Sequence, residues 1–260
     1  MAGKLIFVGL LGLVLGSFIN VVIYRLPIML DRHWQQDQGE TFADRFDLAL
    51  PASSCPHCHH ALRWFENIPL LSFLLQAGRC RYCAAKIHWR YPVVELSGGI
   101  LALLAFATFP EPLRAIFALC LLLGLLALFW IDLEHHLLPD VLTLGLLWVG
   151  LIANTTAWAH IPIREAVIGA AAGYVSLWII REIFARLTGK DGMGLGDVKL
   201  LAALGAWLGW QALPMLVLSA SMLTLIVGGT MLLLGKSRLE TQIPFGPALA
   251  VAGVLMLFFQ

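Results

Sequence analysis

The fold class is decided by residues 113–131, LRAIFALCLLLGLLALFWI, in which Arg114 is the only charged residue. A helix that crosses a bilayer needs about 20 mostly apolar residues, because the hydrocarbon core offers no water to unpaired backbone groups. This run meets the requirement and predicts a transmembrane helix. Seven further stretches on either side are similarly apolar: 5–24, 92–109, 137–153, 164–184, 194–210, 213–234 and 244–259.

The composition of the whole chain is that of a membrane protein. Of its 260 residues, 60% are hydrophobic and 13% are charged, and the mean hydropathy is +0.84. Soluble domains typically contain about 45–50% apolar and about 25% charged residues. The net charge of +1 disfavours bulk electrostatic binding, so no nucleic-acid partner is expected. Disorder and a disulfide-rich secreted scaffold are also disfavoured. We predict an all-α polytopic membrane protein with about eight transmembrane helices.

One polar segment interrupts this pattern and sets the predicted domain organisation. Residues 1–24 form the first transmembrane helix, residues 25–91 a small cytosolic module, and residues 92–260 a seven-helix membrane domain. No small-x-small cleavage site follows the first helix, and Tyr24 and Arg25 lead directly into the polar module. The first helix is therefore expected to be an uncleaved span rather than a signal peptide.

The distribution of Lys and Arg predicts the orientation, because cytoplasmic loops retain positive charge. With both chain ends outside, Lys4, Arg114 and Arg164 fall outside and the other basic residues, 17 − 3 = 14, fall inside. The polar module is therefore expected on the cytoplasmic side of a cytoplasmic membrane. The inside residues are Arg25, Arg32, Arg45, Arg63, Arg79, Arg81, Lys86, Arg90, Arg181, Arg186, Lys190, Lys199, Lys236 and Arg238.

Two CxxC pairs in the polar module predict a metal site. Cys55-Pro-His-Cys58 is followed, after 21 residues, by Cys80-Arg-Tyr-Cys83. Each turn presents two sulfurs, and the intervening segment can bring the second turn opposite the first, so four thiolates can converge tetrahedrally on one ion. Zinc is favoured over iron, because zinc needs neither cluster assembly nor a redox role. Four protein ligands leave no open position, so the zinc is expected to be structural.

Other interpretations of the cysteine-rich segment remain open. Two disulfides would use the same four residues, but the predicted topology places them in the reducing cytosol. His57, His59, His60 and His88 are rival ligands that a complete set of four cysteines leaves unnecessary. Cys120 lies within an apolar run and is expected to act as a small apolar filler.

Two carboxylates near the predicted cytoplasmic boundary are candidate catalytic residues. Asp132 directly follows the helix predicted over 113–131, at its inner end, and Asp197 belongs to Gly194-Leu-Gly-Asp197. The apolar run after Asp197, 198–210, is too short to cross alone, so its helix must draw this acid into the interface. Such acids are costly unless solvent, a partner or a function accounts for them. Two acids from separate helices can share one proton, one activating water while the other polarises a scissile carbonyl.

The remaining charges near this boundary have simpler explanations. Asp140 follows Pro139, and both residue types favour the first turn of a helix. Glu95, near the start of the predicted helix 92–109, is expected to be structural or to face substrate. Lys199 is expected to anchor its helix at the cytoplasmic face. Taken singly, Asp132 and Asp197 could also be interfacial charges or helix caps.

A set of short motifs occurs in order along nearly the whole chain. The motifs are Gly16-Ser-Phe-Ile-Asn20 to Pro27, Pro51 to Cys58, Glu66-Asn67-Ile-Pro69, Gly78-Arg79-Cys80-Arg-Tyr-Cys83, Tyr91 to Leu96, Asp132-Leu-Glu134 to Asp140, Gly194 to Lys199, and Pro244-Phe-Gly-Pro247. By these motifs the chain resembles the bacterial type IV prepilin peptidase family, also called leader peptidase/N-methyltransferase, whose members are GxGD-type intramembrane aspartic proteases. In that family the acid that opens the first aspartate motif and the acid of GxGD form the catalytic pair, which corresponds to Asp132 and Asp197.

The resemblance implies an activity, cofactors and partners. The enzyme would remove the leader peptide of type IV prepilins or type II secretion pseudopilins at the cytoplasmic face of the inner membrane, in contact with membrane lipids. It would also N-methylate the new terminal residue, usually Phe, with S-adenosylmethionine. The family places this activity in the cytosolic module, where Gly78 and Arg79 are weak candidates and no binding residue is assigned. Gly98 and Gly99 are better explained by helix packing than by nucleotide binding.

Two alternatives from other functional classes remain open at this stage. A proton-coupled transporter would also carry carboxylates in its helices, but near the midplane and usually in related halves of the chain. A noncatalytic assembly scaffold of a secretion system would explain the cysteines and the helices, although not the glycine-flanked Asp197.

Overall fold

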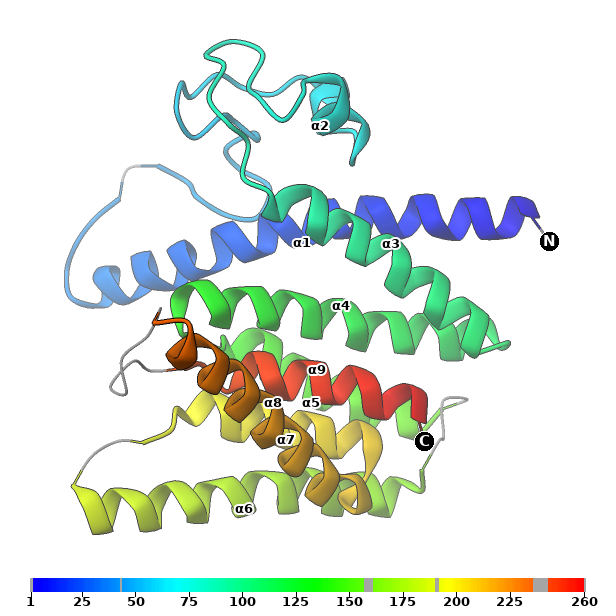
Figure 1. The fold of residues 1–260 in the computed structure, drawn as a ribbon, viewed down its shortest axis with the longest axis vertical. Helices are drawn as coiled ribbons and strands as arrows, with labels where there is room; N and C mark the ends of the chain where they lie inside the picture. The colour runs from blue at the N-terminus through cyan, green and yellow to red at the C-terminus, as the bar shows by residue number, and fades with distance from the viewer. Residues whose placement is uncertain (1, 43, 157–160, 190–191, 236–242, 260) are drawn as a thin grey trace. The chain divides into compact units, whose positions relative to one another are not determined.

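The computed structural model describes residues 2–42, 44–156, 161–189, 192–235 and 243–259. Lys190, Lys236 and Arg238, which contributed to the predicted inside charge, lie outside these ranges. Within them the fold is helical, and β pairing is limited to two isolated bridges, which confirms the predicted all-α class. The helices (Figure 1) are α1 Ala2–Asp37, η1 Trp64–Asn67, α2 Leu71–Leu75, α3 Arg90–Thr108, α4 Pro112–His135, α5 Asp140–Asn154, α6 Ile163–Thr188, α7 Leu195–Leu208, η2 Trp210–Ala212, α8 Leu213–Leu233 and α9 Gly246–Phe259.

Every predicted apolar stretch contains a helix, but the helices differ in length. In the described part of the chain, α1, α3, α4, α6 and α8 are long and apolar enough to cross a bilayer. In contrast, α5 has 15 residues and α7 and α9 have 14 each. At about 1.5 Å per residue these three cover roughly 21–23 Å, less than the ~30 Å hydrocarbon core. The protein is a multi-pass membrane protein, and eight complete crossings stay a prediction.

The first helix extends well beyond the predicted span. α1 continues past Tyr24 to Asp37, with Pro27 inside it, so the start of the predicted cytosolic module is helical. Its last turns are polar and exposed, and the Gln35 amide donates to the Asp31 carboxylate at 3.0 Å. The helix ends before Gly39, whose φ of +97° is a conformation that glycine adopts without a Cβ penalty.

The chain divides into two compact units, Met1–Leu119 and Cys120–Gln260. In the first unit α1 packs on α3 through small residues. A Cβ on Gly12 would lie 2.6 Å from the Gly98 carbonyl oxygen, and a Cβ on Gly16 would lie 2.9 Å from the Glu95 Cα. Glycine at these positions allows two membrane helices to approach closely. The prediction that Gly98 serves helix packing is confirmed.

In the second unit α7 is the buried central helix, and α5, α6 and α9 pack against it. All residues of α7 from Leu200 to Leu208 are buried. Two side chains fix the helix to its neighbour α5: the Trp207 indole N–H donates to the Leu146 carbonyl at 2.8 Å, and the Asn154 amide donates to the Ala206 carbonyl at 3.0 Å. These bonds fix the carboxyl-terminal end of α7, the end opposite to the turn that carries Asp197, on α5.

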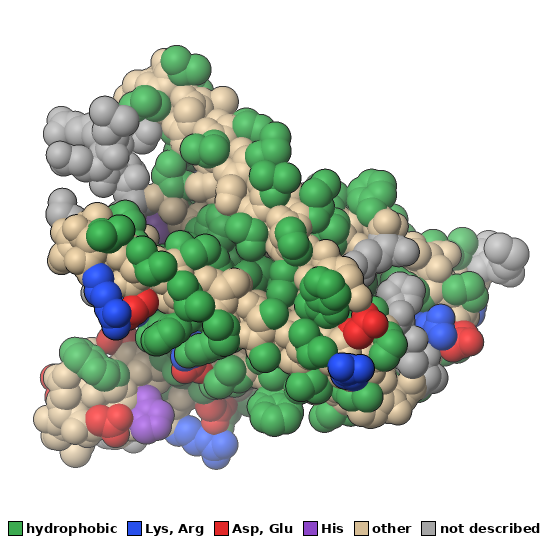
Figure 2. Space-filling view, turned by 90° about the horizontal axis from the view of Figure 1, so that it is seen from below, with side chains coloured by type: hydrophobic (Ala, Val, Ile, Leu, Met, Phe, Trp, Pro, Cys, Tyr) green, Lys and Arg blue, Asp and Glu red, His purple; other side chains and the backbone are tan. Residues whose placement is uncertain are grey.

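The outer surface is apolar. Large hydrophobic side chains are exposed along the long helices, for example Ile180 and Ile183 on α6. Figure 2 shows such side chains spread over one face of the molecule, with only scattered charged groups among them. A soluble protein rarely exposes apolar surface on this scale, so the surface suits contact with lipid.

Candidate active site and cysteine cluster

Asp132 lies in the last turn of α4, and its side chain is buried. The backbone N–H of Gly246, at the start of α9, donates a hydrogen bond to its carboxylate, and the His136 side chain interacts with it electrostatically. A Cβ on Gly246 would lie 2.5 Å from the Asp132 Oδ2 atom. The carboxylate is therefore held in place by a backbone that only glycine allows to come so near.

Asp197 lies in the first turn of α7, which begins after the extended residue Gly194. Its side chain is also buried, and its Oδ1 atom has no hydrogen-bond partner among the described residues. The next glycine, Gly196, lets Leu138 approach, because a Cβ there would lie 2.6 Å from the Leu138 Cβ. Gly196 of the GxGD motif thus allows this turn to pack tightly against Leu138, and one buried carboxylate oxygen of Asp197 is left without a hydrogen-bond partner among the described residues.

The structure brings these two predicted residues together. Asp132 and Asp197 lie close enough for their charges to repel each other, although 64 positions separate them in the sequence, since 197 − 133 = 64. Both carboxylates are at helix ends, one at the end of α4 and one at the start of α7. Two such acids share a proton readily, because ionising both would place like charges side by side in a poorly solvated site.

Neighbouring charges support the turn that carries Asp197. The Lys199 ammonium contacts both carboxylate oxygens of Asp140, at 2.6 and 2.7 Å. Asp140 is in the first turn of α5, as predicted. The Arg181 guanidinium of α6 donates to the Met193 carbonyl at 3.0 Å, just before Gly194. Sequence reasoning missed both contacts and the approach of Gly246, because all three depend on tertiary packing.

In the first unit, the four predicted cysteines converge. Their sulfur atoms all lie within 4.8 Å of one another, with Cys55 Sγ 3.8 Å from Cys83 Sγ and Cys58 Sγ 4.0 Å from Cys80 Sγ. All four are free thiols rather than disulfides. Four sulfurs at about 2.3 Å from a tetrahedral zinc ion would be about 3.8 Å apart. The donor set and its spacing therefore fit a tetrahedral metal ion.

Two matching hairpins hold these sulfurs. In the first, the Cys55 N–H donates to the His60 carbonyl and the His59 N–H to the Cys55 carbonyl. In the second, Cys80 pairs in the same way with Ala85 and Ala84. Each hairpin also closes with an isolated bridge: Ser54 with Ala61 in the first, and Arg79 with Lys86 in the second.

The second hairpin also favours the ionised form of one ligand. Backbone N–H groups of Cys83 and Tyr82 hydrogen-bond to the sulfur of Cys80 and lower the pKa of this thiol to about 7. At Cys83 a backbone hydrogen bond from Ala85 is outweighed by burial and by the neighbouring cysteine sulfurs, which raise the pKa of this thiol to about 11. The hairpin therefore favours the thiolate, which is the form that binds metal, at Cys80 and not at Cys83.

The rival histidines do not belong to the cysteine cluster. Among the described residues, the metal-ligating cluster contains only the four cysteines. The His60 ring lies 3.6 Å from the Tyr82 ring, and the His88 ring lies 5.6 Å from the Trp89 ring. Cys120 is separate from the cluster.

Comparison with known proteins agrees with this arrangement. A family model described as the bacterial peptidase A24 N-terminal domain matches residues 10–109, and one described as the type IV leader peptidase family matches residues 119–229. No solved structure matches. The second match contains both aspartates, and the first contains the four cysteines.

Similar curated proteins cover almost the whole chain. A prepilin leader peptidase/N-methyltransferase of Burkholderia pseudomallei (strain K96243) is 49% identical over 98% of this chain and 85% of its own length. Proteins with the same name from Aeromonas salmonicida (strain A449) and Dickeya chrysanthemi are 48% and 50% identical, over 96% and 95% of this chain and 89% and 90% of their own lengths. The chain belongs to the type IV leader peptidase family.

Proposed function

We propose that this protein cleaves the leader peptide from type IV prepilins or type II secretion pseudopilins and N-methylates the residue that cleavage exposes. The observation that carries the proposal is the meeting of two buried carboxylates, Asp132 and Asp197, at the ends of two helices. Family membership supports both activities, since the similar proteins are named prepilin leader peptidase/N-methyltransferase.

The pair supplies the two groups that amide hydrolysis needs. One aspartate, ionised, takes a proton from water, whose oxygen attacks the scissile carbonyl carbon. The other, protonated, donates its proton to the carbonyl oxygen. Collapse of the tetrahedral intermediate breaks the C–N bond, and a proton passes to the departing amine. The unbonded Oδ1 atom of Asp197 is available for one of these transfers.

The position of the acids favours a peptidase over a proton-coupled transporter. Asp132 is in the last turn of α4 and Asp197 is in the first turn of α7. A transporter usually places such groups near the bilayer midplane. A noncatalytic scaffold would gain nothing from two adjacent buried acids, which are costly to bury.

The basic residues support a cytoplasmic position for the active site and the cysteine cluster, in the inner membrane of a bacterium. Arg45 and Arg63 lie in the polar segment between α1 and α3, and Arg25 lies in the carboxyl-terminal half of α1. Such residues remain preferentially on the cytoplasmic side. The apolar stem of the precursor would then contact the membrane helices and lipid, while its basic leader stays in the cytosol.

The cysteine cluster is proposed to hold a structural zinc ion. The fit of the sulfur spacing to a tetrahedral ion and the absence of an open position within a set of four cysteines support this role. Methyl transfer would use S-adenosylmethionine, which supplies an electrophilic methyl group when bound. The polar module is proposed as the methyltransferase region.

Cleavage by aspartate variants tests the proposed peptidase. We expect Asp132→Asn and Asp197→Asn each to reduce cleavage of a purified prepilin by roughly 10²- to 10⁴-fold, because a general acid or base is lost. Asp31→Asn, an exposed acid on α1, is the control for loss of a carboxylate as such. Cleavage is followed by gel shift with the enzymes in detergent, and near-normal processing by either active-site variant would refute the pair. Addition of a labelled methyl donor to the same reaction measures the second activity.

A further inference from the structure

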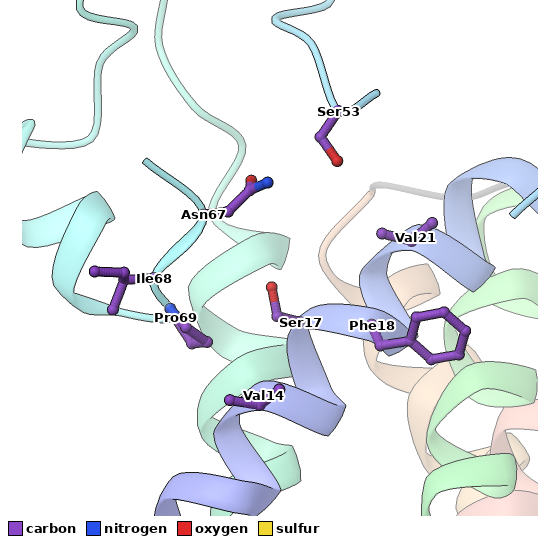
Figure 3. A pocket seen from close by; sticks show the side chains of 8 residues that line it. All are labelled: Val14, Ser17, Phe18, Val21, Ser53, Asn67, Ile68 and Pro69. Atoms are coloured by element: carbon purple, nitrogen blue, oxygen red, sulfur yellow. The ribbon is translucent and has the colours of Figure 1, made fainter. Parts of the chain in front are cut away.

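The first unit contains an open pocket of about 390 Å³ between α1, Ser53 and residues 67–69 at the end of η1. Most of its lining is apolar, and two of its four α1 residues, Val14 and Phe18, are 56% and 49% exposed. Figure 3 shows Val14 and Ser17 projecting from α1 near Pro69, with the polar side chain of Asn67 farther from Val14. The lining residues are Val14, Ser17, Phe18, Val21, Ser53, Asn67, Ile68 and Pro69.

A buried carboxylate, Glu95, adjoins this pocket through its hydrogen bonds, although it is not itself a lining residue. Glu95 accepts hydrogen bonds from the hydroxyl of Ser17, which lines the pocket, and from the backbone N–H of Leu70, which follows the lining residue Pro69. The bond from Leu70 is 2.8 Å long, and Glu95 is only 9% exposed. In the described part of the chain, no Lys, Arg or His pairs with this carboxylate.

A second buried acceptor lies one turn away from Ser17 on the same helix. The Asn20 amide nitrogen donates to the Tyr91 carbonyl at 3.0 Å, but its Oδ1 atom has no partner among the described residues. Asn20 is 3% exposed. Residues three apart on a helix share a face, so Ser17 and Asn20 lie on the same side of α1. Buried acceptors and an unpaired buried acid favour the arrival of a hydrogen-bonding cation.

The chemistry of the pocket indicates one occupant. Its walls suit an apolar side chain, and the acid behind Ser17 suits a positive group attached close to that side chain. The amino-terminal residue of a peptide whose first residue is apolar has both features, with an ammonium group one bond from the Cα. We propose that this pocket binds the first residue of the cleaved substrate and that Glu95 holds its free α-ammonium group.

This inference rests on the proposed function, because cleavage is what creates the free amino terminus. It adds a binding site for the methyl-acceptor end of the substrate, with Glu95 as a positioning residue. The methyl donor is the alternative cationic occupant. Its adenosine would need several polar partners, and the lining offers only Ser17, Ser53 and Asn67. The apolar walls therefore favour the peptide.

A pair of peptides tests the proposal in the full-length protein in detergent, without methyl donor. One short peptide begins with Phe and continues with apolar residues, and its twin is N-acetylated and so lacks the charge. We expect the wild-type protein to bind the free amine at least about tenfold more tightly, which corresponds to one charge-assisted hydrogen bond. In Glu95→Gln the ratio of the two peptides' dissociation constants falls to about one, because the carboxylate is gone.

Glu66→Gln is the matched control. Glu66 is also buried, at 6% exposed, and accepts a hydrogen bond from the Arg63 N–H at 2.9 Å, which gives it a local structural role. Loss of structure would weaken both peptides equally and leave their ratio unchanged, so Glu66→Gln should keep the preference for the free amine. An unchanged preference in Glu95→Gln overturns the proposal. So does a Glu95→Gln variant that loses S-adenosylmethionine binding while it keeps the peptide preference.

A pocket-filling variant covers the case in which Glu95→Gln does not fold. Val14 is 56% exposed, so Val14→Trp can be made without disturbing the core. We expect it to weaken binding of both peptides at least about tenfold, since the large side chain occupies the site of the Phe ring. Unchanged binding overturns the proposal. Cleavage of a full-length prepilin by the wild-type preparation is measured separately, so that failure of the peptidase proposal is distinguished from failure of this one.

Discussion

The position of Gly246 shows how one residue without a side chain can control an acid on another helix. Its N–H donates to the Asp132 carboxylate, and a Cβ would lie 2.5 Å from Asp132 Oδ2. Real Cβ atoms do not approach an oxygen this closely, so any side chain at 246 must displace the carboxylate or the start of α9. The glycine of the motif Pro244-Phe-Gly-Pro247 is therefore explained by contact with the candidate active site.

We expect Gly246→Ala to lower prepilin cleavage by roughly a hundredfold, because a shift of about 1 Å in a reacting group costs that much in rate. Gly145→Ala on α5 is the control, since nothing lies within 4 Å of a Cβ there. Membrane insertion and expression are compared by blotting, and cleavage by gel shift. Full activity of Gly246→Ala would mean that Asp132 tolerates displacement and is not held as described.

At the scale of elements, the short helix α7 depends on glycine-mediated contact with α6. Gly169 and Gly205 face each other so closely that a Cβ on either would collide with the carbonyl oxygen of the other. A Cβ on Gly173 would lie 2.7 Å from the Leu201 carbonyl oxygen. Backbone packing of this kind is typical of membrane helices, which lack a hydrophobic driving force between them. It holds a helix that is too short to be positioned by the bilayer alone.

Gly205→Leu should therefore destabilise the protein by about 1–3 kcal/mol, the usual cost of overpacking a tight interface. Thermal unfolding in detergent measures the effect as a lowered Tm. Gly229→Ala on α8 is the matched control, because nothing lies within 4 Å of a Cβ at that position and alanine is a better helix former than glycine. An unchanged Tm for Gly205→Leu would contradict the close α6–α7 contact.

Hydropathy predicts the existence of these helices better than their ends. The apolar run of α1 stops near Tyr24, but the helix continues to Asp37, since an exposed polar turn can stay helical. Hydropathy reports the length of chain that suits lipid, not the point at which backbone hydrogen bonds stop. Conversely, hydropathy predicts one span over 194–210, whereas α7 ends at Leu208, before Gly209 with a φ of +82°.

At the scale of the molecule, the sequence predicts which residues meet where a motif fixes their spacing. It does not predict contacts that depend on how helices and loops pack. The two CxxC turns predict their own convergence, because each turn is local and the linker is long. The meeting of Asp132 and Asp197 followed from motifs rather than from hydropathy. The hydrogen bond from the Leu70 N–H to Glu95 could not be predicted from the sequence, because it joins a helix to a loop and no motif fixes their distance.

Metal removal tests the role of the cysteine cluster in the first unit. We expect the purified protein to contain about one zinc ion per chain and a strong chelator to make residues 54–87 accessible to protease, because structural zinc sites hold small modules folded. Far-UV circular dichroism should change little, since the long helices lie outside this segment. Cys120→Ser should retain the metal, whereas Cys80→Ser should lose it. Protease resistance that survives complete metal loss would contradict a structural role.

The two cysteine hairpins have a consequence for the architecture of their site. Each has the same hydrogen bonds and a bridge in the same place, and the residue after the second cysteine has nearly the same φ, 55° for His59 and 57° for Ala84. The site thus has approximate twofold symmetry within one polypeptide, and the two hairpins contribute to it equally. Exchanging residues 54–61 with 79–86 would leave the same four sulfurs around the same centre.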